Sequence, residues 1–292
     1  MQPAFVVIDG GHFDDLPQAL RDAGLKARSL FLGQGGRDLE RHGPWLLPLA
    51  SPADTDAVLA LTGTSPAAVF WSCQDGETAL FAHLRRLNMA RLPRWAAMGK
   101  PGPEPNLPAD LGTEAVLFRH WDPNVLGAML PVLDAAQFNR ILGPAQEIAF
   151  HAEEYGGTRR VVCDPNWPQA PTGMLAIRGE QIEALNDRLT ETRRRRVTTY
   201  LKEVAPHETA TFTDPQLRDL VLHSEQTGRD LHLSSDQAHA RWAYVMVRTR
   251  GNALQQPGLR DYIVDGKVSP DDKVRLLLLT MATVEAHGGH AP

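Results

Sequence analysis

The first half of the chain alternates strand-like runs with helix-like segments, and this alternation constrains the fold more than any other feature. Four runs are rich in β-branched and aromatic residues, as strands are, at residues 4–9, 27–32, 67–73 and 114–120. Three segments between them space their apolar residues as amphipathic helices do, at residues 13–24, 51–63 and 76–89. Runs such as Val-Phe-Trp-Ser-Cys are nearly continuous in apolar residues, which favours strands covered on both faces. The sequence therefore predicts an α/β domain with a mostly parallel sheet flanked by helices.

Prolines and glycines mark the remaining parts of this half. They are too frequent in residues 98–113 for regular structure and predict an exposed loop there. Residues 122–144 predict two short helices, each preceded by a capping aspartate, with Gly-Pro ending the second. Residues 146–151 and 158–163 flank a Tyr-Gly-Gly turn and predict a hairpin that completes the domain.

The pattern changes near residue 176, after the proline-rich run Asn-Trp-Pro-Gln-Ala-Pro-Thr-Gly. The apolar period is helical from there on, and the later helices are expected to begin near Thr213, Ser235 and Ser269, each a residue type that caps helix starts. The sequence thus predicts two domains: an α/β domain at 1–175 and an α-helical domain at 176–292.

Charge and cysteine usage narrow the possible partners and the compartment. The 30 Lys and Arg residues are outnumbered by 35 Asp and Glu residues, giving a net charge of −5. Nucleic acid and membrane surfaces are therefore disfavoured as partners. The tetrad Arg193–Arg196 spreads around a helix and reads best as a solvated face. Two widely spaced cysteines indicate neither a disulfide framework nor a zinc site, and they suit a reducing compartment.

The amino terminus carries neither a basic region nor a long apolar region of the kind found in signal peptides. The most apolar run, residues 274–284, is too short to span a bilayer. A cytoplasmic location is the expectation from these two observations.

Motifs for metals and cofactors are missing from the sequence. It contains no His-Glu-x-x-His and no Cys-x-x-Cys, and Asp38 stands where a dinucleotide-binding loop needs its third glycine. A Gly-x-Ser-x-Ala match at residues 63–67 leads into a strand instead of leaving one, so it does not fit a nucleophile elbow. No cofactor and no metal are expected.

One enzymatic hypothesis stays open at this point. Asp9, Cys73 and His120 follow or end predicted strands, where open α/β sheets build their sites. Together they could form the orienting acid, nucleophile and base of a small cysteine-dependent hydrolase. The structural alternative is a buried cysteine and an unrelated histidine at the rim of the sheet.

Six fragments carry a resemblance to a known family, at residues 5–11, 29–33, 42–49, 83–89, 118–133 and 138–144. The most distinctive is Phe-Arg-His-Trp-Asp-Pro-Asn-Val-Leu, which opens the fragment at residues 118–133. In this order the six resemble the adaptors, or chaperones, of type VI secretion effectors, whose N-terminal domain has no assigned function. The resemblance covers the first half of the chain and implies a non-catalytic protein. Such a protein binds an effector and, directly or through that effector, the spike, and it helps to load the effector onto VgrG or a PAAR-tipped spike.

Seven residues are candidates for the protein-binding surface that this resemblance implies, namely Arg85, Arg86, Arg119, Trp121, Asp122, Trp167 and Trp242. Helix phase places Arg85 and Arg86 at the rim of an amphipathic helix, and aromatic residues are frequent interface anchors. Each candidate also has a structural alternative. Asp122 can cap a helix, Arg119 can pair with Asp9 or Asp122, and the three tryptophans can belong to a core.

Overall fold

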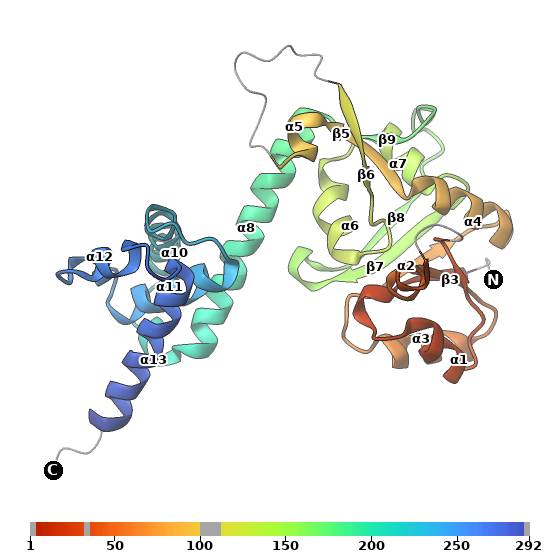
Figure 1. The fold of residues 1–292 in the computed structure, drawn as a ribbon. Coiled ribbons are helices and arrows are strands. Elements are labelled where there is room, and N and C mark those ends of the chain that lie inside the picture. The colour runs from red at the N-terminus through yellow and green to blue at the C-terminus, as the bar shows by residue number, and fades with distance from the viewer. Residues whose placement is uncertain (1–3, 32–35, 100–111, 289–292) are drawn as a thin grey trace. The chain divides into compact units, whose positions relative to one another are not determined.

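The computed structural model describes residues 4–31, 36–99 and 112–288 (Figure 1). The chain divides into two compact units, Met1–Leu189 and Thr190–Pro292. Most of the predicted loop at 98–113 and part of the glycine motif at 33–36 lie outside the described residues.

The main sheet of the first unit has six strands in the order β2-β3-β1-β4-β7-β8. Their bounds are β1 Ala4–Asp9, β2 Arg28–Ser29, β3 Pro44–Leu49, β4 Ala68–Ser72, β7 Glu147–Ala152 and β8 Gly157–Val162. The predicted α/β class is confirmed, but the predicted mostly parallel sheet is wrong, because every pairing among these strands is antiparallel. The β7–β8 pair is the predicted hairpin.

Burial of both faces of the sheet explains why the strands have the near-continuous apolar runs that are typical of parallel strands. One face of β1, with Phe5 and Val7, packs into the larger core, and the other, with Val6 and Ile8, packs into a smaller one. Helices cover both sides, so near-continuous apolar runs result without any parallel pairing. An apolar run therefore reports coverage of a strand and not its direction.

The smaller core is closed mainly by α1 Leu16–Asp22 and α3 Pro52–Thr62, while α2 Gly36–His42 precedes β3. The larger core is closed by α4 Gly76–Leu87, α5 Arg94–Ala97, α6 Pro123–Met129, α7 Ala135–Leu142 and the start of α8 Gly179–Val204. Short 3-10 turns lie at Gly10–His12, Leu130–Val132 and Glu153–Tyr155.

Strand β3 was not predicted, since prolines at residues 44 and 48 argue against a central strand. The register shows how they are tolerated. Leu30 N–H donates to the Pro44 carbonyl, so the even-numbered residues of β3 direct their backbone groups toward β2. Because β2 begins at Arg28, opposite Leu46, the missing N–H of Pro48 faces a position that precedes β2 and has no strand residue opposite it.

A second, three-stranded sheet has the order β6-β5-β9, formed by β5 Met89–Pro93, β6 Thr113–Leu117 and β9 Leu175–Ala176. Strands β5 and β6 are antiparallel and β5 and β9 are parallel. The predicted strand at 114–120 corresponds to β6, but it belongs to this small sheet and not to the main one.

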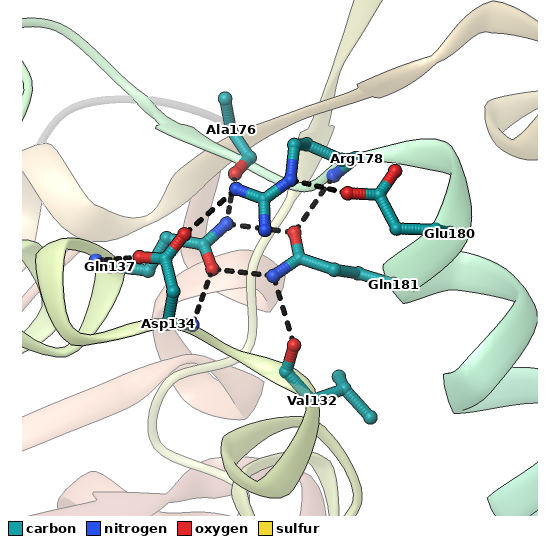
Figure 2. A network of polar contacts seen from close by, with 7 residues as sticks. All are labelled: Val132, Asp134, Gln137, Ala176, Arg178, Glu180 and Gln181. Carbon is teal, nitrogen blue, oxygen red and sulfur yellow. Dashed lines mark hydrogen bonds and ion pairs between the residues drawn. The ribbon is translucent and has the colours of Figure 1, made fainter.

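Residues that follow the predicted boundary at 175/176 form side-chain hydrogen bonds with earlier residues of the first unit. Figure 2 shows the network, in which the buried side-chain amides of Gln137 and Gln181 donate to each other at 2.9 and 2.6 Å. Gln181 also donates to the Val132 carbonyl, and Arg178 reaches Asp134 at 2.8 Å. The network ties the start of α8 to α7 and to the turn before it, while the predicted boundary itself stays a prediction.

The second unit is helical, as predicted. Besides the later part of α8 it contains α9 Pro206–Thr209, α10 Asp214–Asp230, α11 Asp236–Arg248, α12 Leu259–Val264 and α13 Pro270–Gly288, with a 3-10 turn at Ala253–Gln255. Thr213 caps α10 in a reciprocal capping box, and Ser235 caps α11. Of the described helices, none has both the length and the apolar character needed to cross a bilayer.

Candidate protein-binding site

The Phe-Arg-His-Trp-Asp-Pro segment first serves the fold. Arg119 Nη2 lies 2.6 Å from Oδ2 of Asp9, at the end of β1, and 3.4 Å from Oδ2 of Asp122. Asp122 caps α6 by accepting from the backbone N–H of Asn124 at 2.8 Å. Arg119 thus ties the end of β1 to the start of α6, and the structural alternative proposed for Arg119 and Asp122 is present in the fold.

Two further residues of this segment are interior. His120 is fully buried, its Nε2 lies 2.9 Å from Oδ1 of Asn88, and its Nδ1 has no hydrogen-bond partner among the described residues. Burial lowers the pKa of His120 to about 3, so the ring is neutral. Trp121 is 2% exposed and meets the ring of Phe31 edge-on at 5.4 Å. The proposal that Trp121 anchors an interface is therefore corrected: it packs in the larger core.

The three hydrolase candidates are engaged separately. Asp9 binds Arg119, His120 binds Asn88, and the thiol of Cys73 lies 3.6 Å from the Pro144 carbonyl. In the part of the chain that is described, no two of the three bond to each other. Burial raises the pKa of the Cys73 thiol, which opposes formation of the nucleophilic thiolate. The hydrolase hypothesis gains no support from this geometry.

The arginines of α4 lie beside an open groove. Leu80, Leu84 and Leu87 bury one stripe of the helix, which leaves Arg85 and Arg86 exposed. The groove has a volume of about 530 Å³ and is lined by Leu30, Phe31, Phe81, Ala82, Arg85, Arg86, Asn88, Met89 and Leu117. It combines apolar walls with two cations, a composition suited to a protein segment that carries both apolar and acidic side chains.

Two arginine side chains lie near the Phe81 ring at the edge of this groove. The guanidinium carbon of Arg28 lies 3.8 Å from the ring centroid, and that of Arg85 lies 5.8 Å away. Arg28 also pairs with Glu77 at 3.1 Å, whereas no described residue forms an ion pair with Arg85 or Arg86. Their charges remain available to a ligand.

The last two tryptophan candidates are in different settings. Trp242 is fully buried in the second unit, where its Nε1 donates to Oγ1 of Thr227 at 2.9 Å, so its proposed surface role is also corrected. Trp167 is half-buried and stacks on Phe138 with centroids 5.5 Å apart. Because the core of a helical unit needs large apolar side chains, an isolated tryptophan in the sequence does not distinguish core from surface.

The second unit contains a second groove, which the sequence analysis did not predict. It has a volume of about 560 Å³ and is lined by Tyr200, Val204, Arg241, Tyr244, Arg275, Leu278, Leu279, Met281 and Ala282. Leu276 and Leu279 of α13 are 41% and 57% exposed. The run of four leucines in this helix could have indicated an exposed apolar surface. Its side chains point to every face of the helix, and contact with one core cannot bury all of them.

Within the described ranges, no group of three or more His, Cys, Asp or Glu side chains could hold a metal ion.

The fold defines the class: an α/β domain whose main sheet is antiparallel, followed by a helical unit. Residues 4–140 match the family model of a domain of unknown function, DUF4123. This domain is associated with adaptors of type VI secretion effectors. No curated protein and no solved structure matches the chain. The match spans both α4 and the Arg119 segment, and stops before the second unit.

Proposed function

We propose that this chain is a non-catalytic adaptor that binds a type VI secretion effector in the cytoplasm and helps to load it onto the VgrG spike or a PAAR-tipped spike. The match of residues 4–140 to DUF4123 carries the proposal. It agrees with the six fragments of the sequence that resemble such adaptors, because five of them fall within this span and the sixth, residues 138–144, overlaps its end.

The groove beside α4 supports a binding role for the first unit. Arg85 and Arg86 have no ion-pair partner among the described residues, and the apolar walls next to them include the half-exposed Leu117. An acidic and partly apolar effector segment complements this surface. The proposal requires neither cofactor nor metal.

Co-expression with the effector encoded by a neighbouring gene, followed by size-exclusion chromatography, tests the proposal. Co-elution is expected with the unaltered chain. The double reversal Arg85→Glu/Arg86→Glu should reduce co-elution, because it replaces two attracting charges with two repelling ones. An effector that elutes separately from the unaltered chain would remove the main support for the adaptor function.

A matched control is available on α1 and in the segment after it, and α1 closes the smaller core on the opposite side of the main sheet from α4. Arg21→Glu/Lys26→Glu makes the same change in net charge at two exposed positions. It should leave co-elution unchanged. Equal losses from the two double variants would mean that overall charge, and not the groove, controls binding.

The non-catalytic part of the proposal has its own test. Cys73→Ala removes the thiol but little volume, so folding, effector binding and effector export should all persist. If export is lost while binding is retained, the chain performs a chemical step and the adaptor proposal is wrong in that respect.

A further inference from the structure

Among the described strands, β6 forms an edge of the small sheet, because its one described partner is β5. Phe118 N–H donates to the Asn88 carbonyl at 2.8 Å, and Arg94 N–H donates to the Gly112 carbonyl at 3.3 Å. These two bonds fix which residues of β6 exchange hydrogen bonds with β5, since such pairs alternate along an antiparallel ladder. The even-numbered residues of β6 bond to β5.

The odd-numbered residues Thr113, Ala115 and Leu117 therefore direct their N–H and C=O groups away from β5. No backbone hydrogen bond from a described residue reaches these groups. The outer edge of β6 thus presents three donors and three acceptors in the spacing of a β-ladder.

The other edge strands, β2, β8 and β9, have features that disfavour pairing with a further strand, and β6 lacks these features. Strands β2 and β9 have two residues each. Strand β8 is as long as β7 but carries Arg159 and Arg160, and charged side chains on an edge discourage a further strand. Strand β6 has five residues, contains no proline, lysine or arginine, and has Glu114 as its one charge.

On one face of the small sheet, β6 is continuous with an apolar pocket. Ala90 and Leu92 of β5 and Val116 of β6 share this face, and they line a pocket of about 180 Å³. Its other walls come from β6 and the turn after it, α6, the residue that follows β9, and the start of α8: Leu117, Phe118, Arg119, Val125, Met129, Ile177, Ile182 and Leu185. An aliphatic side chain from a strand beside β6 would enter it.

The opposite face of the small sheet contributes to the groove beside α4 that Arg85 and Arg86 line. Leu117 is 52% exposed, lies opposite Met89 in the register, and lines that groove with it. Exposed Arg91 follows Met89 on the same face, and it joins Arg85 and Arg86 in having no ion-pair partner among the described residues. This face therefore favours acidic side chains near an apolar contact.

We propose that the outer edge of β6 receives an extended segment of the effector as an additional strand, with aliphatic side chains on one face and acidic side chains on the other. The inference rests on the proposed function and specifies how the effector is held. Main-chain hydrogen bonds supply affinity in this mode, and alternate side chains entering the two flanking depressions supply specificity.

Ala115→Pro tests the edge directly. The Ala115 N–H points outward, so proline removes a docking donor without removing a bond to β5, and proline is tolerated on edge strands. With the effector encoded by the neighbouring gene as probe, the dissociation constant should rise by at least about tenfold. Ala115→Ser keeps the N–H and should bind as the unaltered chain does.

Val162→Pro is the matched control on the β8 edge. Cys163 N–H donates to the Gln146 carbonyl, which makes Val162 an outward-directed residue of β8. This variant should bind the effector normally. Normal binding by folded Ala115→Pro, or equal losses from both proline variants, would overturn the strand-addition proposal.

Hydrogen exchange in the unaltered chain gives a reading that does not depend on a variant folding. The outward amides of Thr113, Ala115 and Leu117 should exchange rapidly in the free chain and slow at least about tenfold in the complex. The amides of Glu114 and Val116, already bonded to β5, should change less. Protection of the outward amides in the free monomer would show that the chain itself occupies the edge, contrary to the proposal.

The outcomes separate this inference from the proposed function. If the unaltered chain forms no complex with the effector, the adaptor function fails and the strand addition fails with it. If the complex forms but exchange at β6 is unchanged, the adaptor function stands and the strand addition is wrong. A chain that dimerises until Ala115→Pro makes it monomeric would identify a second copy as the occupant and overturn the effector-strand proposal.

Discussion

Arg119 shows how a residue that looks like a surface contact in the sequence can hold the fold together. Its guanidinium is 44% exposed, yet it pairs with the carboxylate of Asp9, which is 1% exposed. Gly11 N–H donates a further hydrogen bond to Asp9 at 3.0 Å. A carboxylate this deeply buried depends on such partners, because desolvation of an unpaired charge is costly.

Arg119→Ala should therefore destabilise the first unit by about 2 kcal/mol, since it leaves a buried carboxylate without its cation. Arg85→Ala is the control: Arg85 is exposed and forms no ion pair with a described residue, so the change should stay within about 0.5 kcal/mol. Urea denaturation measures both. Equal stabilities of the two variants would mean that the charge of the Asp9 carboxylate is stabilised sufficiently without Arg119.

His120 predicts a pH dependence of stability. Its pKa is lowered to about 3 by burial, while the unfolded chain has an ordinary value near about 6.5. Below that value the unfolded chain takes up a proton that the folded chain cannot. Stability from this residue is fully present above about pH 6.5 and is lost as the pH falls toward the folded pKa.

The expected loss from His120 between pH 7.5 and pH 5 is about 2 kcal/mol. His120→Gln removes this titration, so the variant should lose less stability over the same interval by about that amount. Burial also lowers the pKa of His83, which adds a loss of the same sign in both proteins. Urea denaturation at the two pH values gives the difference, and parallel losses in both proteins would contradict the assignment to His120.

At the scale of elements, caps and turns were the features best determined by local sequence. Asp122 and Asp134 begin α6 and α7, and Gly143 ends α7. These signals act through a few neighbouring backbone groups, so no distant contact is needed to interpret them.

Two helix-ending glycines in nearly the same backbone conformation separate local from tertiary effects. Gly143 has φ of 56° and Gly63 has φ of 54°. A Cβ at Gly143 would lie 2.2 Å from Cε1 of the buried His83, whereas a Cβ at Gly63 would meet nothing within 4 Å. Substitution by alanine therefore strains the backbone about equally at both positions, but it causes a steric clash only at Gly143.

Gly63→Ala should cost about 1–2 kcal/mol from backbone strain alone. Gly143→Ala should cost at least about 2 kcal/mol more, because the buried His83 ring has to move. Chemical denaturation of the two variants measures this difference. Equal costs would indicate that the ring relaxes freely.

At the scale of the whole molecule, α8 contributes to both units. Ile182 near its start packs into the larger core of the first unit, and Leu201 near its end packs into a core of the second. The change of sequence pattern near residue 176 marks where the helical period begins. The division between the two compact units falls later in the chain, after Leu189.

A chain truncated after Leu189 should fold cooperatively and melt at least about 10 °C above one truncated after residue 175. The shorter chain loses the buried side chains of Ile177 and Ile182 and leaves Gln137 without its amide partner. Circular dichroism melts of the two chains measure the difference. Equal melting temperatures would place the boundary at 175/176.

The sequence by itself determined many of the longer helices and five of the six main strands approximately, several of their starts, and that central strands such as β1 are covered on both faces, but it missed β3, β5 and β9. These properties depend on residue type, spacing and nearest-neighbour capping. The Arg119 alternatives were also visible, because few carboxylates stood at suitable positions.

Only the tertiary structure decided the strand directions, the assignment of β6 to a separate sheet, the burial of Trp121 and Trp242, and the edge of β6 that no other described strand pairs with. The reason is physical. An apolar pattern shows that a face is buried but not what buries it, and strand pairing joins backbone groups that are alike at every position. Which partner each element takes depends on the packing of the whole chain.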